Sequence, residues 1–378
     1  MTQGPRSYSP QKHESQNERM RVLVGLSGGI HSAVTAALLK TQGHDVVGMY
    51  LETQVPGALS ATENHCSSGN AKSHAEKAAA SLGIEFHVAD ISALYQAKVL
   101  DYLVHERSLG HSPNPCVPCN REVKLGSLFA KAAELRCDKV ATGHGAQVFH
   151  DPRTGSYQLL QAGDSSRDQS PFLFTLSQEN LSKLLLPLGN FPRNMVSKLG
   201  AEYGFSDVLS NSQAICFSNI SATAPYVESR LAPALRPQGV MKTGNDQVIG
   251  EHRGLHRYQL GARVEPEVTA VSTEGLIVVG LDLPNHGMML GTPEQLLKKE
   301  CVIFGTHWLK ALHQLKGLRC FGRILPEKAP VACRLTFFEN QTAHVEFDER
   351  QGPLFPGQAI VFYQENEVLG GGWIHTTS

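Results

Sequence analysis

The stretch VGLSGGIHSAV, residues 24–34, decides how the first part of the chain folds. An apolar run over residues 21–25 precedes two adjacent glycines, and Ile30, Val34 and Leu38 then recur at helical spacing. A glycine turn between a strand and a helix lets an anion approach the backbone, and the start of the helix attracts negative charge. The backbone N–H groups of residues 27–30 are therefore predicted to bind a phosphate. The same sequence is also compatible with a tight turn that binds no ligand. The Walker pattern GK[ST] is absent from this loop.

The same alternation of strand and helix continues to residue 144. Further strands are predicted over 44–53, 84–92 and 137–144, with helices over 71–83 and 94–110. This rhythm predicts an α/β domain in which a parallel sheet has helices on both faces. Ligands of such sheets bind at the carboxyl ends of the strands, where residues 25–32 and 142–144 fall.

The bulk properties limit the classes of protein that fit. The 378 residues suffice for two or three domains, and a net charge of −1 leaves any polyanion to be bound by local patches. The sequence has no apolar run long enough to span a bilayer. Residues 1–20 are polar, do not resemble a secretory signal, and are predicted to form a disordered tail. The eight cysteines then indicate cytoplasmic thiols rather than a disulfide scaffold.

The amino-acid composition and pattern of the chain change after about residue 220. Glycine and proline become frequent, and short runs such as GLIVVGLD, VACRLTFF and QAIVFYQ alternate with turn residues. We expect a catalytic domain over 21–218, a small mixed module over 219–288, and a compact β-barrel or sandwich over 289–378.

Two cysteines stand in SPNPCVPCNREVKLG, residues 112–126. Cys116 and Cys119 precede a predicted helix that Asn120 is expected to cap, and a helix start lowers the pKa of a thiol and suits a nucleophile. A C-x-x-C pair also fits a zinc site, an iron–sulfur cluster or a redox disulfide. Cys216, in NSQAICFSN, would by itself be a buried thiol.

The ordered set of motifs points to a family. GLSGGIHSAV, NPCVPCNREVK, ATGH, DSSRDQSPFLFTLS, AICFS, IGEHRGLHRYQLG and PGQAIVFY…VLGGGWI follow one another from about residue 21 to the end. The chain thus resembles the tRNA-specific 2-thiouridylases, ATP-pyrophosphatase-type enzymes that place sulfur on the wobble uridine of tRNA. The resemblance implies an adenine nucleotide α-hydrolase-like α/β domain, a small mixed module and a C-terminal β-barrel.

The resemblance also implies a mechanism and its residues. ATP adenylates the C2 oxygen of uridine, a persulfide on Cys216 delivers sulfur, and Cys119 assists its release and ends in a disulfide with Cys216. The implied cofactors are ATP and Mg²⁺, and the partners are tRNA and a sulfur-donor protein or sulfide; a monomer is expected. The implied ATP-binding residues are Gly25, Leu26, Ser27, Gly28, Gly29, Ile30, His31, Ser32, Leu51 and Gly143. The implied tRNA contacts are Asn114, Pro115, Cys116, His144, Arg167, Asp168, Gln169 and Gln358.

Two departures from the family pattern concern the site itself. His31 stands where the family has an acid that organises ATP and its magnesium, and a neutral imidazole is a poor ligand for that hard cation. A protonated imidazole could instead contact phosphate. Cys116 stands where many members have aspartate, so Cys116, Cys119 and Cys216 could hold a [4Fe–4S] cluster that uses sulfide as the donor.

Other departures lie on the tRNA side. Asn211 stands where the family has an aspartate. Residues 262–270 and 319–330 lack basic or aromatic residues that the family has at these places. The segment 230–263 is nevertheless rich in arginine, which fits either an RNA-facing surface or a solvated face. A non-catalytic tRNA-binding or sulfur-carrying paralogue therefore stands as an alternative. A different adenylating enzyme of the same fold is disfavoured by the barrel and the paired thiols.

Overall fold

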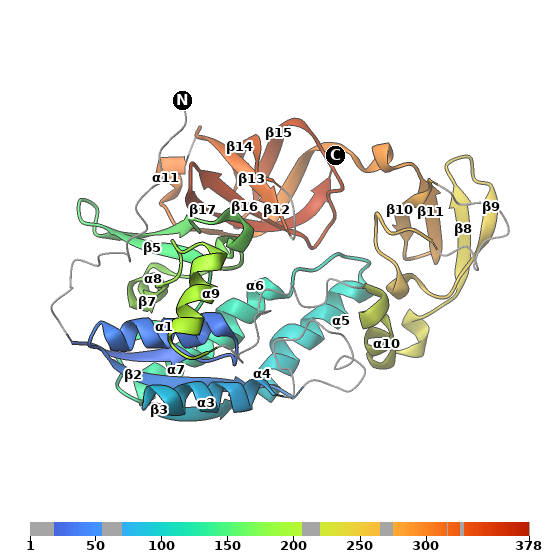
Figure 1. Cartoon of the computed structure of the whole chain (residues 1–378). Helices are drawn as coiled ribbons and strands as arrows, with labels where there is room; N and C mark the ends of the chain where they lie inside the picture. Colours follow the sequence, from blue (N-terminus) through green and yellow to red (C-terminus); the bar gives the residue numbers. More distant parts are fainter. Residues whose placement is uncertain are drawn as a thin grey trace.

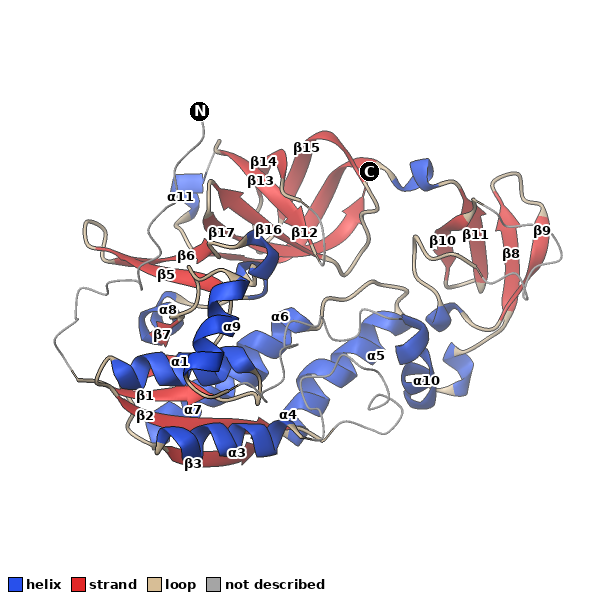
Figure 2. Ribbon diagram, viewed as in Figure 1, coloured by secondary structure: helices blue, strands red, loops and turns tan. Residues whose placement is uncertain are grey.

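The computed structural model describes residues 19–54, 70–205, 220–264, 275–315, 317–325 and 329–377. A parallel sheet with its helices, a small four-stranded sheet, and a barrel with an attached hairpin follow one another along the chain (Figures 1 and 2). Within these residues, none of the helices has the length and apolar character that crossing a membrane requires.

The N-terminal sheet has five parallel strands in the order β3-β2-β1-β4-β7. Its central strand is buried on both faces because Val22 and Val24 pack on one side and Leu23 on the other. The α/β fold predicted from the alternation of strands and helices is confirmed. The strands are β1 (Arg21–Gly25), β2 (Asp45–Glu52), β3 (Glu85–Asp90), β4 (Lys139–Ala141) and β7 (Leu184–Leu185).

Helices cover both faces of this sheet. Val22 and Val24 share a core with α1 and α3, whereas Leu23 packs with Leu125 and Leu128 of the cysteine-bearing helical segment. The helices of this part are α1 (Ile30–Thr41), α3 (Ala71–Leu82), α4 (Ser92–Tyr95), α5 (Asp101–Ser108), α6 (Cys116–Pro118), α7 (Gly126–Glu134), α8 (Gln178–Lys183) and α9 (Arg193–Glu202). Two π-helical segments, η1 (Gln96–Leu100) and η2 (Cys119–Leu125), and two 3-10 turns, η3 (Ser165–Arg167) and η4 (Ser170–Phe172), complete it.

The small module has its own sheet and core. Its strands run in the order β10-β11-β8-β9, and Met241, Val278 and Leu290 are buried between them and the neighbouring turns. The elements are α10 (Ile220–Arg230), η5 (Pro233–Leu235), β8 (Gly239–Thr243), β9 (Val248–His252), η6 (Leu255–Arg257), β10 (Ile277–Asp282), β11 (Gly287–Gly291) and η8 (Pro293–Leu296).

The C-terminal part is a closed barrel, which settles the choice between barrel and sandwich. Six antiparallel strands follow the order β12-β15-β14-β13-β16-β17, and β17 pairs back with β12. The hairpin of β5 (Ala146–Asp151) and β6 (Ser156–Gln161) extends the same sheet through the pairing of Leu160 with Glu367. The barrel elements are β12 (Lys298–Trp308), α11 (Leu312–Leu315), β13 (Arg319–Ile324), β14 (Val331–Phe337), β15 (Ala343–Gln351), β16 (Ala359–Gln364) and β17 (Glu367–Thr377).

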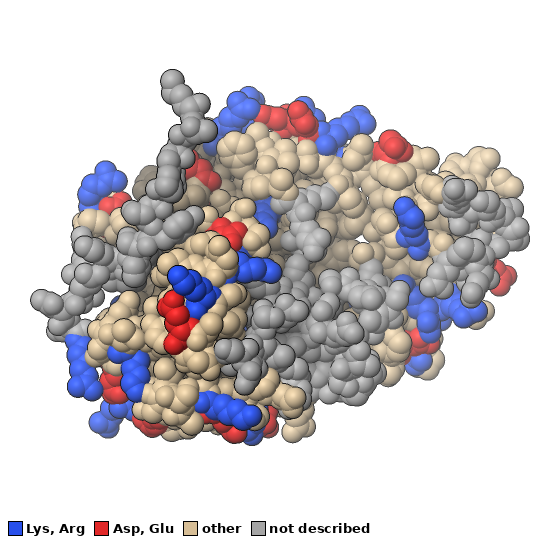
Figure 3. All heavy atoms as spheres, in the orientation of Figure 1, with Lys and Arg blue, Asp and Glu red and all other residues tan. Residues whose placement is uncertain are grey.

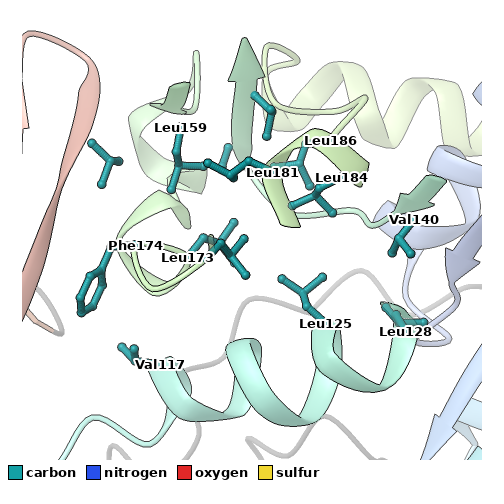
Figure 4. Packing of buried hydrophobic residues seen from close by; sticks show 14 of the residues in the cluster. Val117, Leu125, Leu128, Val140, Leu159, Leu173, Phe174, Leu181, Leu184 and Leu186 are labelled. Atoms are coloured by element: carbon teal, nitrogen blue, oxygen red, sulfur yellow. The ribbon is translucent and has the colours of Figure 1, made fainter. Parts of the chain in front are cut away.

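One apolar cluster connects the parallel sheet to the barrel. Leu125 and Leu128 face Leu181 and Leu184 across this cluster, and Val117 lies at its edge beside the cysteines (Figure 4). The cluster continues to Val361 and Tyr363 of β16 in the barrel. The cysteine segment is therefore held between two domains by buried apolar contact rather than by surface loops.

Candidate functional site

The glycine loop connects β1 to α1 at the carboxyl edge of the parallel sheet. Gly28 has a φ of 77°, and a side chain there would collide with the backbone of Ala71, so only glycine fits this turn. Ser27 is exposed, whereas Gly28, Gly29 and Ile30 are buried. The first turn of α1 contains no acidic residue, so its positive end faces the loop uncompensated.

Two hydroxyl groups close this loop on itself. The N–H of Ser27 donates to Ser32 Oγ at 3.1 Å, the N–H of Gly29 lies 3.4 Å from Ser27 Oγ, and the Ser32 hydroxyl donates to Gly29 O at 2.8 Å. The sequence predicted that the N–H groups of residues 27–30 bind a phosphate. In this structure the N–H groups of Ser27 and Gly29 instead lie against the two serine hydroxyls of the loop.

His31 is a buried, neutral residue at the start of α1. It is 8% exposed, and burial lowers its pKa to about 4, with smaller contributions from the positive charges of Arg167 and Arg193. The imidazole is therefore uncharged at neutral pH.

The segment after β4 lies directly against this helix start. A side chain on Gly143 would approach the backbone carbon of His31 to 2.8 Å, so the close contact requires glycine. Leu51 is the penultimate residue of β2, the neighbouring strand, and the N–H of Leu26 donates to Met49 O at 2.8 Å. The predicted ATP-binding residues thus meet at one edge of the sheet, as the parallel topology requires.

A chain of hydrogen bonds joins that edge to the cysteines. The amide Nδ2 of Asn120 donates to Cys116 O at 2.9 Å, which leaves its oxygen to accept from His144 Nε2 at 3.1 Å. The Thr142 hydroxyl then donates to His144 Nδ1 at 2.8 Å. Burial lowers the pKa of His144 to about 3, so the ring is neutral and keeps one fixed tautomer.

The two cysteines lie one helical turn apart in α6 and η2. Cys119 is buried at 9% exposure against Val99, Leu100 and Val123, whereas Cys116 is half-buried. Asn120 was expected to cap the helix, but it lies inside η2 and its side chain binds the carbonyl four residues before it. Cys216 and Asn211 lie outside the described residues.

The barrel anchors the other side of the cysteine segment. Ala359 N–H donates to Asn114 Oδ1 at 2.7 Å, and Ser112 N–H donates to Pro356 O at 2.9 Å. Gln358 is 8% exposed and its side chain accepts from the Phe355 N–H at 2.8 Å. The predicted tRNA-contacting residues Asn114, Pro115 and Gln358 are therefore placed together where the cysteine segment meets the barrel.

A buried ion pair also joins the two domains. Asp168 Oδ2 accepts from Arg323 Nη1 at 2.7 Å, with the Asp168 side chain 2% exposed. Asp168 Oδ1 accepts from the N–H groups of Ala162 and Ser170, so the carboxylate is fully engaged. Arg323 was not singled out by the sequence, because its partner lies 155 residues away.

Arg167 and Gln169 flank Asp168 in the sequence and both contact Gly145. Gln169 exchanges two hydrogen bonds with Gly145, which follows His144, through its side chain and its N–H. Arg167 is 2% exposed and donates through Nη1 to Phe191 O. Both were predicted to touch tRNA, and both lie beside the segment 142–145.

The arginine-rich segment 230–263 is partly paired. Arg257 binds Glu228, Arg230 lies 3.8 Å from Asp101, and Lys242 lies 3.6 Å from Asp246. Basic side chains gather beside α10 in Figure 3, while elsewhere on that face the two signs alternate. His252 and His256, which lie in the same segment, are buried at 1% and 4% exposure and so do not belong to an exposed basic surface.

The described side chains do not fit a resident divalent cation. They include no group of three His, Cys, Asp or Glu residues arranged for a metal ion, and the loop position expected to be acidic is the neutral His31. The donor set near the loop consists of N–H groups, hydroxyls and guanidinium groups, which suit an anion.

These features define the class: a HUP-type α/β domain with a glycine loop and paired thiols, joined to a C-terminal barrel. Residues 20–219 match the family model described as tRNA methyl transferase HUP domain, and residues 298–374 match the aminomethyltransferase beta-barrel domain. The chain belongs to the tRNA-specific 2-thiouridylase family, as its motifs predicted.

The relatives match over nearly their whole length. The chain is 36% identical over 366 residues to the tRNA-specific 2-thiouridylase MnmA of Geobacter metallireducens, covering 95% of this chain and 98% of that one. It is 34% identical over 363 residues to the relative of the same name from Geotalea uraniireducens, with coverages of 95% and 96%. The relative from Nostoc sp. is 35% identical over 362 residues, with coverages of 95% and 99%.

Proposed function

We propose that this protein is an ATP-dependent tRNA-uridine 2-sulfurtransferase that acts on the wobble uridine. The observation that supports this function most directly is the hydrogen-bond chain from Thr142 through His144 and Asn120 to Cys116. It fixes the segment of the two thiols against the loop expected to bind the nucleotide. An enzyme that activates an oxygen with ATP and then replaces it with sulfur needs both groups at one substrate atom.

The chemistry proceeds in two stages. The C2 oxygen of uridine attacks the α-phosphate of ATP, pyrophosphate leaves, and C2 becomes a good electrophile. The terminal sulfur of a persulfide on Cys216 attacks C2, and AMP leaves with the former oxygen. The Cys119 thiolate then attacks Sγ of Cys216, releases the thiouridine sulfur, and forms a disulfide that an external thiol reduces.

The remaining site residues have supporting roles in this proposal. Gly25 to Ser32, Leu51 and Gly143 enclose ATP; Asn114, Pro115 and Cys116 contact the base; and His144, Asp168, Gln169 and Gln358 line the path of the tRNA. The target base must leave its stack to reach them. We expect the protein to act as a monomer supplied by a persulfide-donor protein. The described residues do not fit Mg²⁺.

An iron–sulfur variant would use the same substrate with sulfide as donor. The observation in its favour is the one-turn separation of Cys116 and Cys119, which with Cys216 would give three ligands. Iron analysis and the visible absorbance of anaerobically purified protein distinguish the two forms. Iron with absorbance in the blue identifies the cluster form, and colourless active protein identifies the persulfide form.

The test is a tRNA sulfuration assay read by nucleoside mass spectrometry. Unmodified tRNA and ATP are incubated with a persulfide or sulfide donor, with Cys216→Ser and, as a matched control, Cys137→Ser, a half-buried thiol outside the site. ATP-dependent 2-thiouridine is expected from the wild type and the control only. Absence of thiouridine with every donor, with tRNA still bound, would identify a non-catalytic binding paralogue.

A further inference from the structure

Arg167 places a positive charge inside the protein beside the glycine loop. Its Nη1 donates to Phe191 O, while Nε and Nη2 are buried and have no hydrogen-bond partner among the described residues. No carboxylate of those residues lies within ion-pair distance of it. The carboxylate of Asp164 interacts with Arg167 through its charge but forms no ion pair with it. Its oxygens accept hydrogen bonds from the N–H and hydroxyl of Ser166 and from the N–H of Arg193.

A buried guanidinium with two unsatisfied nitrogens is energetically unfavourable without an anion. Burial lowers the pKa of Arg167, but a guanidinium stays protonated at any physiological pH. Asp164 offsets part of this charge without pairing with it, and an anion from outside the described residues can bind the two unsatisfied nitrogens. Such an anion would meet a planar fork of N–H donors, the geometry that binds phosphate oxygens in pairs.

Arg167 lies close to the glycine loop that is expected to bind the phosphates of ATP. A side chain on Gly145 would lie 2.0 Å from Arg167 O, so Arg167 is stacked against the segment that also touches His31. Phe191, which accepts from Arg167, shares a core cluster with Ile30 at the start of α1. The charge of Arg167 lies near enough to His31 to lower the pKa of that ring.

The loop itself offers little else for binding a phosphate with its metal. The N–H groups of Ser27 and Gly29 donate to the hydroxyls of the loop, and the first turn of α1 has no acid. His31 is neutral and stands where a carboxylate would hold a cation. What remains is the positive end of α1 and the guanidinium of Arg167.

We propose that Arg167 binds the phosphates of ATP directly, and that nucleotide binding by this protein needs no divalent cation. The proposal rests on the proposed function, because it concerns the same loop and the same nucleotide. His31 in place of the acid would then change how ATP is bound. Because position 31 carries no carboxylate, the guanidinium of Arg167 is available to bind a phosphate.

Calorimetric titration of the full chain with ATP tests this, once in EDTA and once with excess Mg²⁺. We expect dissociation constants within about threefold of each other. Binding that is at least about tenfold weaker in EDTA overturns the proposal and leaves the proposed function intact. Absence of ATP binding in both buffers overturns the proposed function and this inference together.

Variants locate the effect. Arg167→Met should weaken ATP binding in EDTA by about tenfold or more, since a charge-assisted bond is lost, whereas the exposed Arg153→Met should stay within about twofold. If Arg167→Met does not fold, as judged by circular dichroism, Arg167→Lys keeps the charge without the fork and should give a smaller loss. Wild-type affinity in the Arg167 variant overturns the proposal.

His31→Asp provides the reverse experiment. The charge of Arg167 acts on this position, so the new carboxylate should offset it; ATP binding in EDTA should then fall by about tenfold and Mg²⁺ should restore it. His31→Asn matches the Asp variant in size but carries no charge, so its dissociation constants for ATP in EDTA and in Mg²⁺ should agree within about threefold. Equal behaviour of the Asp and Asn variants would contradict the proposed role of Arg167.

Discussion

The imidazole Nε2 of His144 donates to the amide oxygen of Asn120 at 3.1 Å, across a sequence separation of 24 residues. This bond joins the segment after β4, which lies against the glycine loop, to the π-helical segment of Cys119. Because His144 is neutral and accepts from Thr142 on its other nitrogen, the bond has a fixed direction. The two halves of the candidate site are thus held in register by a hydrogen bond between two side chains.

Asn120→Ala should separate nucleotide binding from sulfur transfer. The variant removes the bonds to His144 and to Cys116 O, and a small displacement of the thiols relative to an activated base costs about tenfold to a hundredfold in rate. ATP affinity should stay within about twofold, since the relay lies away from the phosphates. Single-turnover thiolation and calorimetry measure the two quantities.

The exposed Asn366→Ala, in the turn between β16 and β17, is the matched control and should behave as the wild type. Equal losses of ATP affinity and thiolation rate in Asn120→Ala would mean that Asn120 supports the whole fold rather than the register of the thiols.

Arg323→Met should destabilise the barrel strongly. It leaves the carboxylate of Asp168 buried without its cation, at a cost of about 3–5 kcal/mol. Both tryptophans, Trp308 and Trp373, lie in barrel strands, so their fluorescence during urea unfolding reports on this domain. Arg319→Met, on the same strand, breaks a pair whose arginine is 68% exposed and should cost less than about 1 kcal/mol. Similar costs for both variants would show that burial does not decide the value of the Asp168 pair.

The sequence predicts the fold well because its signals are local. Buried valines and a leucine alternate along β1, glycines mark the turn into α1, and these patterns require no knowledge of distant residues. The gathering of the glycine loop, Leu51 and residues 142–144 also follows from topology, since parallel strands end at one edge. The choice between barrel and sandwich depends on the pairing of β12 with β17, which no local pattern encodes.

The details of the site depend on partners far apart in the chain. Asn120 is a residue type that often caps helices, but it lies inside η2 and its side chain is hydrogen-bonded to His144. Asp168 pairs with Arg323, which lies in the segment 319–330. In that segment the sequence indicates only that residues typical of the family are absent. The charge state of His31 likewise follows from burial and from Arg167, neither of which the loop sequence reveals.

Acid should destabilise the wild type partly through His31. In the unfolded chain this ring takes up a proton near pH 6.5, but in the folded protein only near pH 4, so lowering the pH through this window favours unfolding. The full shift corresponds to about 3 kcal/mol. His31→Asn lacks this titration, so its free energy of unfolding should fall less between pH 7 and about 4.5. Parallel urea curves for the two proteins across this range would show that His31 titrates normally.

tRNA binding should depend on those arginines of the segment 230–263 for which no ion pair is found among the described residues. Arg253 and Arg263 are exposed, whereas Arg257 is held by Glu228. Each phosphate contact that is lost lowers the slope of log affinity against log salt by about 0.7 to 0.9. Arg253→Gln with Arg263→Gln should therefore weaken tRNA binding, most at low salt, and reduce this slope by about one to two.

The exposed Arg334→Gln on the barrel strand β14 is the control for this double variant, since it removes a charge outside the segment. Filter binding of tRNA over a range of salt concentrations measures both proteins, and the ATP affinity of each should match the wild type. If the double variant and the control shift the slope equally, the arginines contribute general charge, and the surface of the small module is a solvated face rather than the tRNA interface.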